Sequence, residues 1–599
     1  MNNRRFFLLL NSTRLMSLLI VNLLLAKGVA AQASPTPLLA QAPLPPGTNS
    51  DGLPQTPLPG RQQEPTITPL PPVEDFLDSL PNQSPAEGIP DSEVEFTVKE
   101  FKLEGNTVLD QESVEEVLAQ YRDRSLTFAD LLQLETDLTR LYTENGYINS
   151  GVVIPAQDVN QDVIILQAIE GQIDTITVNV DGRLREGYIR SRLKRGAKTP
   201  LNIEELQEAL QLLQLNPLVE SLNAELSVGR SRDRWQLDVN VNQEEAFDPV
   251  LFVNNSRTPS VSSFQRGLEF NHNNVLGYAD RFSFVFKDTD GSDDFDFSYN
   301  FPVNALDGTV GFRYRLINSD IIEGEFESLG IESQTDEFEF TFRQPILLTA
   351  SAESTQELAL GLEFSRQSNE VTLFNPLLQA DVPFPDLSPG ADEAGETQIS
   401  ALRFFQDWTK RTRSSVFAAR SQFSVGVDVF DATVNEEDPD AIFFAWRGQV
   451  QWLRQLEESS NINLLLRSDI QISGDELVPL ETFSVGGIQS VRGYRQDVLL
   501  GDSGIFASAE VRIPFYRWSN NRNSLSVVPF VDFGTAWNNS DDDDSEEDTL
   551  VSLGLGLRLD LIETLSARID YGIPLVDVSE IGDSLQEDGL YFSLEYFPF

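Results

Sequence analysis

Apolar and polar residues alternate with a period of two from about residue 248 to the C-terminus. RFSFVFKD, residues 281–288, places three phenylalanines on one face, and LGLGLRLDL, residues 553–561, does the same with leucines. The opposite faces carry Ser, Asp, Arg, Glu, Thr and Gly. A strand that faces lipid needs such an apolar face, whereas in water it would be a hazard. A soluble β-sandwich would explain the alternation but not the density of aromatic rings, so we favour a membrane β-barrel.

About sixteen such strands follow one another in residues 247–599, an even number as expected for a single-chain bacterial barrel. Three connections are long and acidic (374–397, 431–440 and 541–548), whereas others, such as 301–307, are short. Long loops at one end and short turns at the other are typical of outer-membrane barrels. The pattern therefore predicts a transmembrane β-barrel of about sixteen antiparallel strands over residues 247–599.

Residues 93–171 have a mixed α+β pattern. EFTVKEFKLEG alternates and predicts one strand. Asp110 and Thr127 can each cap a helix, and the second helix carries leucines at helical spacing before Gly146 ends it. GYINSGVVIP and DVIILQAIEG predict two further strands. The predicted element order is β-α-α-β-β.

The same order recurs over residues 172–246. A strand in IDTITVNVDG precedes a helix over 186–195, a second helix in NIEELQEALQLLQLN, and the strands VESLNAELSVG and RWQLDVNVNQ. Two consecutive units with one element order form an internal repeat. Sheets in such domains have exposed edges, which can accept an extended peptide as an added strand.

The first 92 residues predict no folded domain. Arg4, Arg5 and Arg14 accompany a short apolar run over 15–26, and small residues follow near Ala31. This arrangement predicts a secretory signal peptide over residues 1–33, and the run is too short to favour a transmembrane anchor. Residues 34–92 are rich in Pro, Gln, Ser and Thr, so we expect a disordered linker with polyproline character.

Composition narrows the functions that the chain can have. The formal net charge is −51, which argues against nucleic-acid binding because phosphates require a basic surface. The chain has no cysteine, which excludes thiolate chemistry, and one histidine, His272, which nearly excludes His-based sites. Acidic runs at 244–245 and 541–548 are interpreted as solvated loops rather than catalytic or Ca²⁺ sites. We expect no enzymatic activity, no cofactor and no metal.

The most specific segment is FSVGGIQSVRGYRQD, residues 483–497. Gly486, Gly487 and Gly493 permit tight turns and a close approach of backbones. Arg492 lies among small and apolar residues, where a guanidinium needs a carboxylate or several acceptors. Counting strands places this segment between the eleventh and the twelfth.

A later strand offers that carboxylate. VVPFVDFGTAW, residues 527–537, directs Asp532 and Phe530 to the lumen if the residues between them face lipid. Asp532 is therefore a candidate acceptor for Arg492.

In these residues the chain resembles the outer-membrane transporters of two-partner secretion. This is the hemolysin secretion/activation (ShlB/FhaC/HecB) type, within the wider BamA-type outer-membrane assembly superfamily. The resemblance covers nearly everything after residue 92. It rests on Val491-Arg492-Gly493-Tyr494, on Phe530-x-Asp532-x-Gly534, on the EGQIDTITV junction between the repeats, and on the terminal Phe599.

The resemblance implies a separate role for each part of the chain. The repeats over 93–171 and 172–246 would be periplasmic POTRA domains that capture the N-terminal region of an unfolded exoprotein. The sixteen-stranded barrel would carry that exoprotein across the outer membrane, surrounded by lipid. The loop with Arg492 would fold back into the barrel and contact Asp532. Phe599 would end the C-terminal signal that the barrel-assembly machinery reads.

Two other functions stay open at this point. An insertase that assembles other outer-membrane proteins commonly has more than the two POTRA-like repeats found here. A passive porin needs neither such repeats nor an internal Arg loop. Family members often carry an N-terminal plug helix, but the only candidate, VEDFLDSL at 73–80, is too short to fill a barrel of this size. The sequence therefore does not predict a plug.

Overall fold

The computed structural model describes residues 95–598, except for 158–162, 232, 384, 386–387, 437–438, 458–460, 520–522, 540–548, 562–563 and 579–581. The predicted signal peptide, the linker, the acidic run at 541–548 and Phe599 therefore lie outside the described residues. No α-helix among the described residues is long and apolar enough to cross a membrane.

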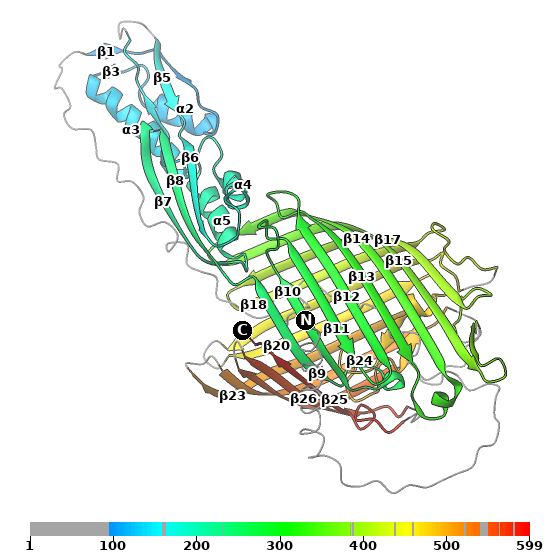
Figure 1. The fold of residues 1–599 in the computed structure, drawn as a ribbon. Coiled ribbons are helices and arrows are strands. Elements are labelled where there is room, and N and C mark those ends of the chain that lie inside the picture. The colour runs from blue at the N-terminus through cyan, green and yellow to red at the C-terminus, as the bar shows by residue number, and fades with distance from the viewer. Residues whose placement is uncertain are drawn as a thin grey trace, which may run out of the picture. The chain divides into compact units, whose positions relative to one another are not determined.

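The first domain has the predicted α+β architecture (Figure 1). Its elements are β1 (Phe96–Thr97), β2 (Glu100–Glu104), α2 (Gln111–Ala119), β3 (Ser125–Leu126), α3 (Phe128–Glu144), β4 (Gly151–Val153) and β5 (Val163–Ile169). The sheet order is β2-β5-β4, with β2 parallel to β5. The prediction of a single strand over EFTVKEFKLEG was wrong. The two halves bond to different partners, because β1 pairs with β3 while β2 pairs with β5.

The caps of the two helices are the predicted ones. Asp110 accepts hydrogen bonds from the first turn of α2. The Thr127 hydroxyl accepts from the backbone of Asp130, whose side chain accepts from the backbone of Thr127, a reciprocal capping box. Leu131, Leu134, Leu138 and Tyr142 form the buried face of α3, and Leu141 is partly buried beside it. This core joins the helices to the sheet.

The second domain repeats the topology of the first. It comprises β6 (Gln172–Asp181), α4 (Glu186–Gly196), α5 (Ile203–Gln214), β7 (Val219–Ser231) and β8 (Arg234–Gln243). The last strand is again central, in the order β6-β8-β7, and again parallel to the first strand. Apart from the short β1–β3 pair of the first domain, this confirms the β-α-α-β-β order of both units.

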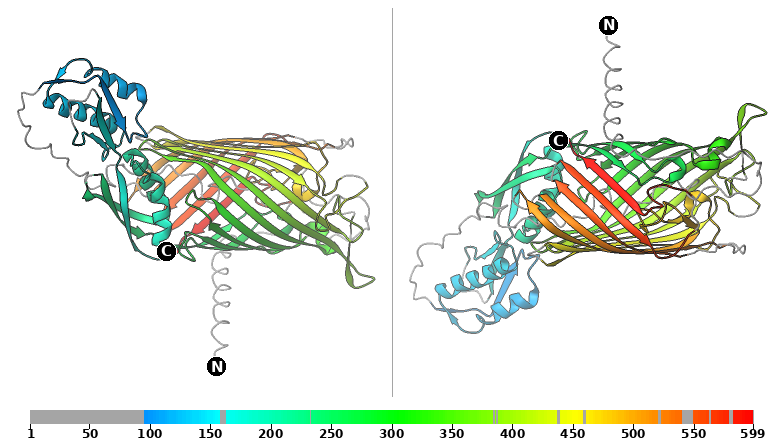
Figure 2. Two further views of the ribbon diagram at one scale, coloured as in Figure 1. Left: turned by 90° about the horizontal axis from the view of Figure 1, so that it is seen from above. Right: turned by 90° about the horizontal axis from the view of Figure 1, so that it is seen from below.

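Sixteen antiparallel strands of the described chain form the wall of a closed barrel. They are β9 (Phe247–Asn254), β10 (Gln265–His272), β11 (Arg281–Asp288), β12 (Ser292–Pro302), β13 (Thr309–Asp320), β14 (Ile331–Ala350), β15 (Ser354–Asn375), β17 (Glu396–Thr412), β18 (Ser415–Gly426), β19 (Phe444–Glu457), β20 (Ile462–Ser473), β23 (Ser503–Trp518), β24 (Asn523–Trp537), β25 (Thr549–Leu561), β26 (Leu565–Pro574) and β27 (Leu590–Tyr596). A short strand, β16 (Ala380–Pro383), extends the outer end of β15. Figure 2 shows the C-terminal strands, in red, closing the wall beside the first strands, and β27 pairs with β9.

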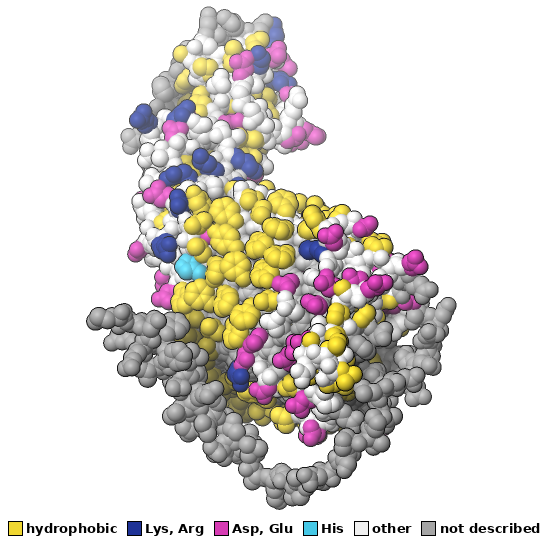
Figure 3. Space-filling view, turned by 45° about the vertical axis from the view of Figure 1, so that its right-hand side comes forward, with side chains coloured by type: hydrophobic (Ala, Val, Ile, Leu, Met, Phe, Trp, Pro, Cys, Tyr) yellow, Lys and Arg dark blue, Asp and Glu magenta, His cyan; other side chains and the backbone are white. Residues whose placement is uncertain are grey.

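The two faces of the wall differ as the alternation requires. Leu553, Leu555 and Leu557 point outward, and Leu555 is 52% exposed. Figure 3 shows hydrophobic side chains gathered in a broad apolar belt over the barrel strands on the face in view. Inward positions carry ion pairs instead, for example Arg315 Nη2 to Asp294 Oδ2 at 2.6 Å. Because every wall strand has two neighbours, no backbone edge is left for lipid to cover.

The two ends of the barrel also differ. The connections 273–280, 303–308 and 351–353 contact the second domain. Longer connections leave the opposite end, including 376–395, 427–443 and 474–502. The last of these carries the candidate site.

Candidate functional site: a loop held inside the barrel

The connection 474–502 joins β20 to β23, the eleventh and twelfth wall strands, as the sequence predicts. Two short strands within it, β21 (Phe483–Val485) and β22 (Leu499–Gly501), pair antiparallel. Phe483, Val485, Val491 and Tyr494 pack with side chains of β23, β24 and β25 in one buried cluster. The loop thus lies against the inner wall rather than in solvent beyond the barrel.

Glycines shape the entrance of the loop. Gly486 and Gly487 have φ values of 121° and 86°, which side chains rarely allow. A Cβ at Gly486 would lie 2.3 Å from the carbonyl oxygen of Arg495. The Ser490 hydroxyl accepts from the backbone N–H of Gly486 at 2.8 Å and thereby closes the turn. This local geometry directs Arg492 towards the wall.

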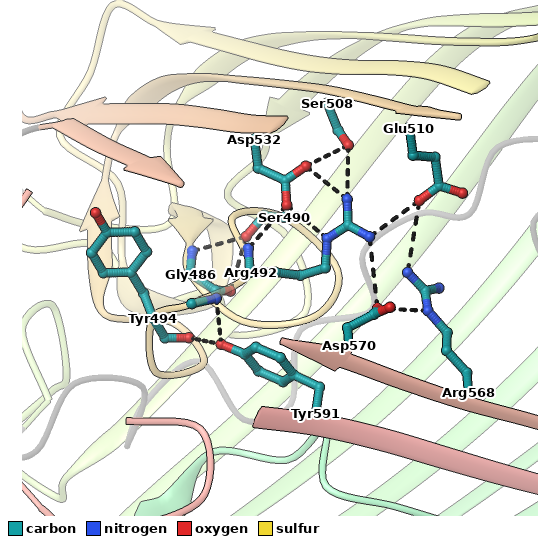
Figure 4. A network of polar contacts seen from close by, with 11 residues as sticks. Gly486, Ser490, Arg492, Tyr494, Ser508, Glu510, Asp532, Arg568, Asp570 and Tyr591 are labelled. Atoms are coloured by element: carbon teal, nitrogen blue, oxygen red, sulfur yellow. Dashed lines mark hydrogen bonds and ion pairs between the residues drawn. The ribbon is translucent and has the colours of Figure 1, made fainter. Parts of the chain in front are cut away.

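Arg492 forms a bidentate ion pair with Asp532 of β24 (Figure 4). Its Nε donates to Asp532 Oδ2 at 2.7 Å, and its Nη2 donates to Asp532 Oδ1 at 2.8 Å. The backbone N–H of Arg492 also donates to Oδ2, at 3.2 Å. Both side chains are fully buried, at 0% exposure. Paired fork-to-fork donors are the strongest arrangement that a guanidinium can make with a carboxylate.

Two further carboxylates surround the same guanidinium. Arg492 Nη1 donates to Glu510 Oε2 of β23 at 3.1 Å and lies 3.6 Å from Asp570 Oδ2 of β26. Arg568 lies on the far side of both carboxylates, 2.6 Å from Asp570 and 3.7 Å from Glu510. The loop arginine therefore completes a network of side chains from three wall strands, β23, β24 and β26.

The Phe-x-Asp-x-Gly strand contributes more than its carboxylate. The ring of Phe530 lies under the guanidinium, with 3.5 Å between Arg492 Cζ and the ring centroid. Gly534 leaves the room that the loop occupies, because a Cβ there would lie 2.4 Å from Val485 Cγ1 and 2.8 Å from Val491 Cγ2. The three inward positions of this strand thus pair with, stack on and accommodate the loop.

Glycines on the neighbouring strands have a related role. A Cβ at Gly554 would lie 2.0 Å from Phe530 Cζ, and one at Gly556 would lie 2.2 Å from Asp570 Oδ1. On β26, a Cβ at Gly572 would lie 2.5 Å from the backbone nitrogen of Gly493. These glycines therefore leave the inner face of the wall without side chains at the places where the loop and its network pack closely against it.

Gly493 and Tyr494 fasten the backbone beyond Arg492. The N–H of Gly493, whose φ is 102°, donates to the hydroxyl of Tyr591 on β27 at 3.1 Å. The same hydroxyl donates to the carbonyl of Tyr494. The Tyr494 hydroxyl reaches the backbone of the adjoining wall, donating to Val551 O at 2.8 Å.

A second anchor holds the loop at Arg495. Its Nη1 and Nη2 donate to the two carboxylate oxygens of Glu323 at 2.6 and 2.5 Å, and Nη1 donates to Glu587 at 3.2 Å. Glu323 lies in the connection between β13 and β14, and Glu587 lies between β26 and β27. The loop is thus tied to two other connections at the same end of the barrel.

The structure brings together Val491, Arg492, Gly493, Tyr494, Phe530, Asp532 and Gly534. Phe599 lies outside the described residues. Sequence reasoning missed Glu510, Asp570, Tyr591 and the wall glycines. Their inward position could have been read from the alternation, but only the arrangement of strands around the barrel shows that they meet the loop.

Comparisons with known proteins agree with this architecture. Residues 96–171 match the family model of the ShlB-type POTRA domain, and residues 393–559 match that of the haemolysin secretion/activation protein ShlB/FhaC/HecB. The chain is 23% identical over 495 residues to the outer membrane transporter CdiB of Escherichia coli, covering 80% of this chain and 79% of that protein. It is 19% identical to the heme/hemopexin transporter protein HuxB of Haemophilus influenzae, covering 70% of this chain and 72% of that protein.

A solved structure extends the likeness to the whole fold. CdiB from Escherichia coli superposes with a TM-score of 0.62 at 18% identity, covering 88% of this chain and 94% of that one. The repeats, the closed barrel and both family matches point the same way. The chain is an outer-membrane transporter that matches the haemolysin secretion/activation protein models over residues 96–171 and 393–559, with its barrel in the outer membrane and its N-terminal repeats in the periplasm.

Proposed function

We propose that this transporter captures an unfolded exoprotein in the periplasm and passes it through the barrel to the cell surface. The observation that carries the proposal is the buried ion pair of Arg492 and Asp532, which holds an outer loop against the inner wall of a closed barrel. A permanent plug would not need it, because apolar packing alone could hold such a loop. A charged anchor can separate once both groups are hydrated.

The lumen supports the passage of an extended chain. Inward positions alternate acids and arginines, such as Asp296 with Arg313 and Asp469 with Arg447. Such a wall offers both donors and acceptors to a passing backbone. The sequence contains no Gly-Lys-Ser/Thr phosphate loop, so we infer that folding of the exoprotein outside the cell supplies the driving force.

The POTRA sheets support capture. In each domain the last strand is central, so the outer edges belong to β2 and β4 in the first domain and to β6 and β7 in the second. An edge strand offers unpaired backbone groups to an extended segment. Deleting residues 172–245 is expected to abolish capture and leave the barrel assembled.

The test is export in cells. The full chain, the Arg492→Ala variant and the matched control Arg558→Gln are expressed with a large candidate exoprotein encoded by the adjacent gene. Arg558 pairs with Asp560 in the lumen, outside the Arg492 network. We expect normal barrel insertion in all three and impaired export for Arg492→Ala alone. Full export by Arg492→Ala would refute the role of the anchor.

The insertase function predicts a different result. If the chain assembled other outer-membrane proteins, its deletion would lower the amounts of several unrelated barrels while the exoprotein still reached the surface. Export lost without any change in other barrels supports the proposal.

A further inference from the structure

The second domain carries a strongly basic segment in an otherwise acidic protein. Residues 183–198 contain seven Lys and Arg and one Glu, a net charge of 7 − 1 = +6, whereas the whole chain carries −51. Neither the channel nor the Arg492 network uses these residues. We name residues 183–198, which include α4, the basic segment. A concentration of one sign of charge attracts a partner of the other sign.

The basic segment contacts the barrel at the periplasmic margin of its apolar belt. Arg183 Nη2 donates to the carbonyl of Val275 at 3.2 Å, and Arg185 Nε donates to that of Leu276 at 3.0 Å. Leu276 is 54% exposed, so an exposed apolar side chain and two arginines of the second domain meet at this turn. Figure 3 shows Lys and Arg side chains gathered beside the belt.

The next turn of the barrel repeats this arrangement. Arg192 forms an ion pair with Asp307, and Arg195 Nη1 lies 3.5 Å from the carbonyl of Ala305. Val303 and Leu306 of the same turn are exposed at 47% and 42%. The second domain therefore presents cations along the rim where hydrocarbon gives way to headgroups.

Aromatic rings mark the same level. The guanidinium of Arg185 lies 4.6 Å from the ring centroid of Tyr278, which in turn packs on Phe301. Tyr side chains are enriched where a membrane surface meets water, and long basic side chains place their charge in that layer. Exposed apolar residues, aromatic rings and arginines thus coincide at one depth.

From this placement we infer that the basic segment binds anionic phospholipid headgroups of the periplasmic leaflet. The lipid phosphates would meet Arg183, Arg185 and Lys194, which are exposed. An acidic peptide is the other class of anion that a basic surface attracts, but it would not require the exposed apolar rim. The inference is independent of the proposed export.

The test uses the full chain in nanodiscs made of equal parts phosphatidylethanolamine and phosphatidylglycerol. After detergent extraction, native mass spectrometry counts the lipids that stay bound. The wild-type protein should retain phosphatidylglycerol in preference to phosphatidylethanolamine. Each neutralised charge should lower that preference about fivefold, so Arg183→Gln/Arg185→Gln/Lys194→Gln should lower it on the order of a hundredfold. Glutamine keeps a donor for the barrel carbonyls while removing the charge.

The matched control is Lys99→Gln/Lys102→Gln/Arg124→Gln, which removes three exposed charges from the first domain. It should retain phosphatidylglycerol like wild type. An equal loss in the control, or no loss in the triple variant, would overturn the inference. So would a wild type with no lipid preference that binds a polyglutamate peptide in lipid-free detergent.

A variant could also retain less phosphatidylglycerol because its second domain has separated from the barrel. Two measurements distinguish this outcome from a direct loss of lipid binding. The chain has no cysteine, so spin labels on Glu204→Cys and Glu353→Cys report the separation of the second domain from the barrel. The Lys194 side chain makes no hydrogen bond or ion pair to any described residue, so Lys194→Gln should leave docking unchanged. That single variant should lower the preference about fivefold, and an unchanged preference would contradict the inference.

Discussion

Replacing Arg492 with Ala should release the loop from the inner wall, and the structure gives the size of the effect. Arg492 and Asp532 are both fully buried, so solvent does not screen the pair. Removing one partner of a buried ion pair costs about 3–5 kcal/mol, because the other charge stays buried without compensation. Asp532 depends on Arg492 in particular. Glu510 keeps Arg512 at 2.8 Å and Asp570 keeps Arg568 at 2.6 Å, but Asp532 has no other cation within ion-pair distance among the described residues.

The penalty applies only while the loop covers Asp532, because a displaced loop lets water reach the carboxylate. The equilibrium between the held and the displaced loop should therefore shift by a factor on the order of a hundred to several thousand. Hydrogen exchange of the backbone amides in residues 486–497 of the full chain measures this opening directly. Single-channel conductance of the reconstituted protein gives an independent readout, with longer open periods expected.

The double variant Arg492→Ala/Asp532→Ala sharpens the test. It removes the uncompensated carboxylate, so its exchange should lie between those of wild type and Arg492→Ala. Arg558→Gln, a lumen variant outside the network, should exchange like wild type. Unchanged exchange in Arg492→Ala, or a double variant that opens more than the single one, would refute this account of the anchor.

Three further predictions use the same full-length protein. Gly534→Leu should displace the loop with Arg492 and Asp532 intact, since the side chain would overlap Val491, and exchange at 486–497 should rise by the equivalent of about 1–3 kcal/mol. Arg495→Gln should accelerate exchange near its own position about tenfold, less than Arg492→Ala, because its partners are partly exposed. Thr127→Ala should raise exchange in α3 about fivefold, since a helix cap contributes about 1 kcal/mol. Hydrogen bonds from the Thr127 side chain and backbone lower the pKa of Asp130, so this stabilisation is present above the ordinary pKa and is lost as pH falls through the lowered one. Wild-type α3 should therefore lose protection in acid, and Thr127→Ala should show less of that pH dependence.

Much of the fold could be predicted from local pattern. A lipid-facing wall leaves a period of two in the sequence, so the number of strands and their outward faces followed from it. The caps at Asp110 and Thr127 followed in the same way, because a cap involves residues a few positions apart. The error over EFTVKEFKLEG has the opposite cause. Its break at Val98–Lys99 depends on β3 and β5, which the local pattern does not contain.

For the candidate site, too, some residues could be predicted from the local sequence and others could not. The sequence by itself determined that Arg492 lies in a glycine-rich loop and that Asp532, which faces the lumen, is a candidate acceptor for it, and the family resemblance implied their contact. Only the tertiary structure decided that Glu510, Asp570 and Tyr591 reach the same loop, and that Arg495 meets Glu323 across 172 positions of sequence. Periodicity fixes which face of a strand a side chain occupies. Which faces meet is decided by the closure of the barrel and by the packing of the loop within it, and both depend on contacts between residues far apart in the chain.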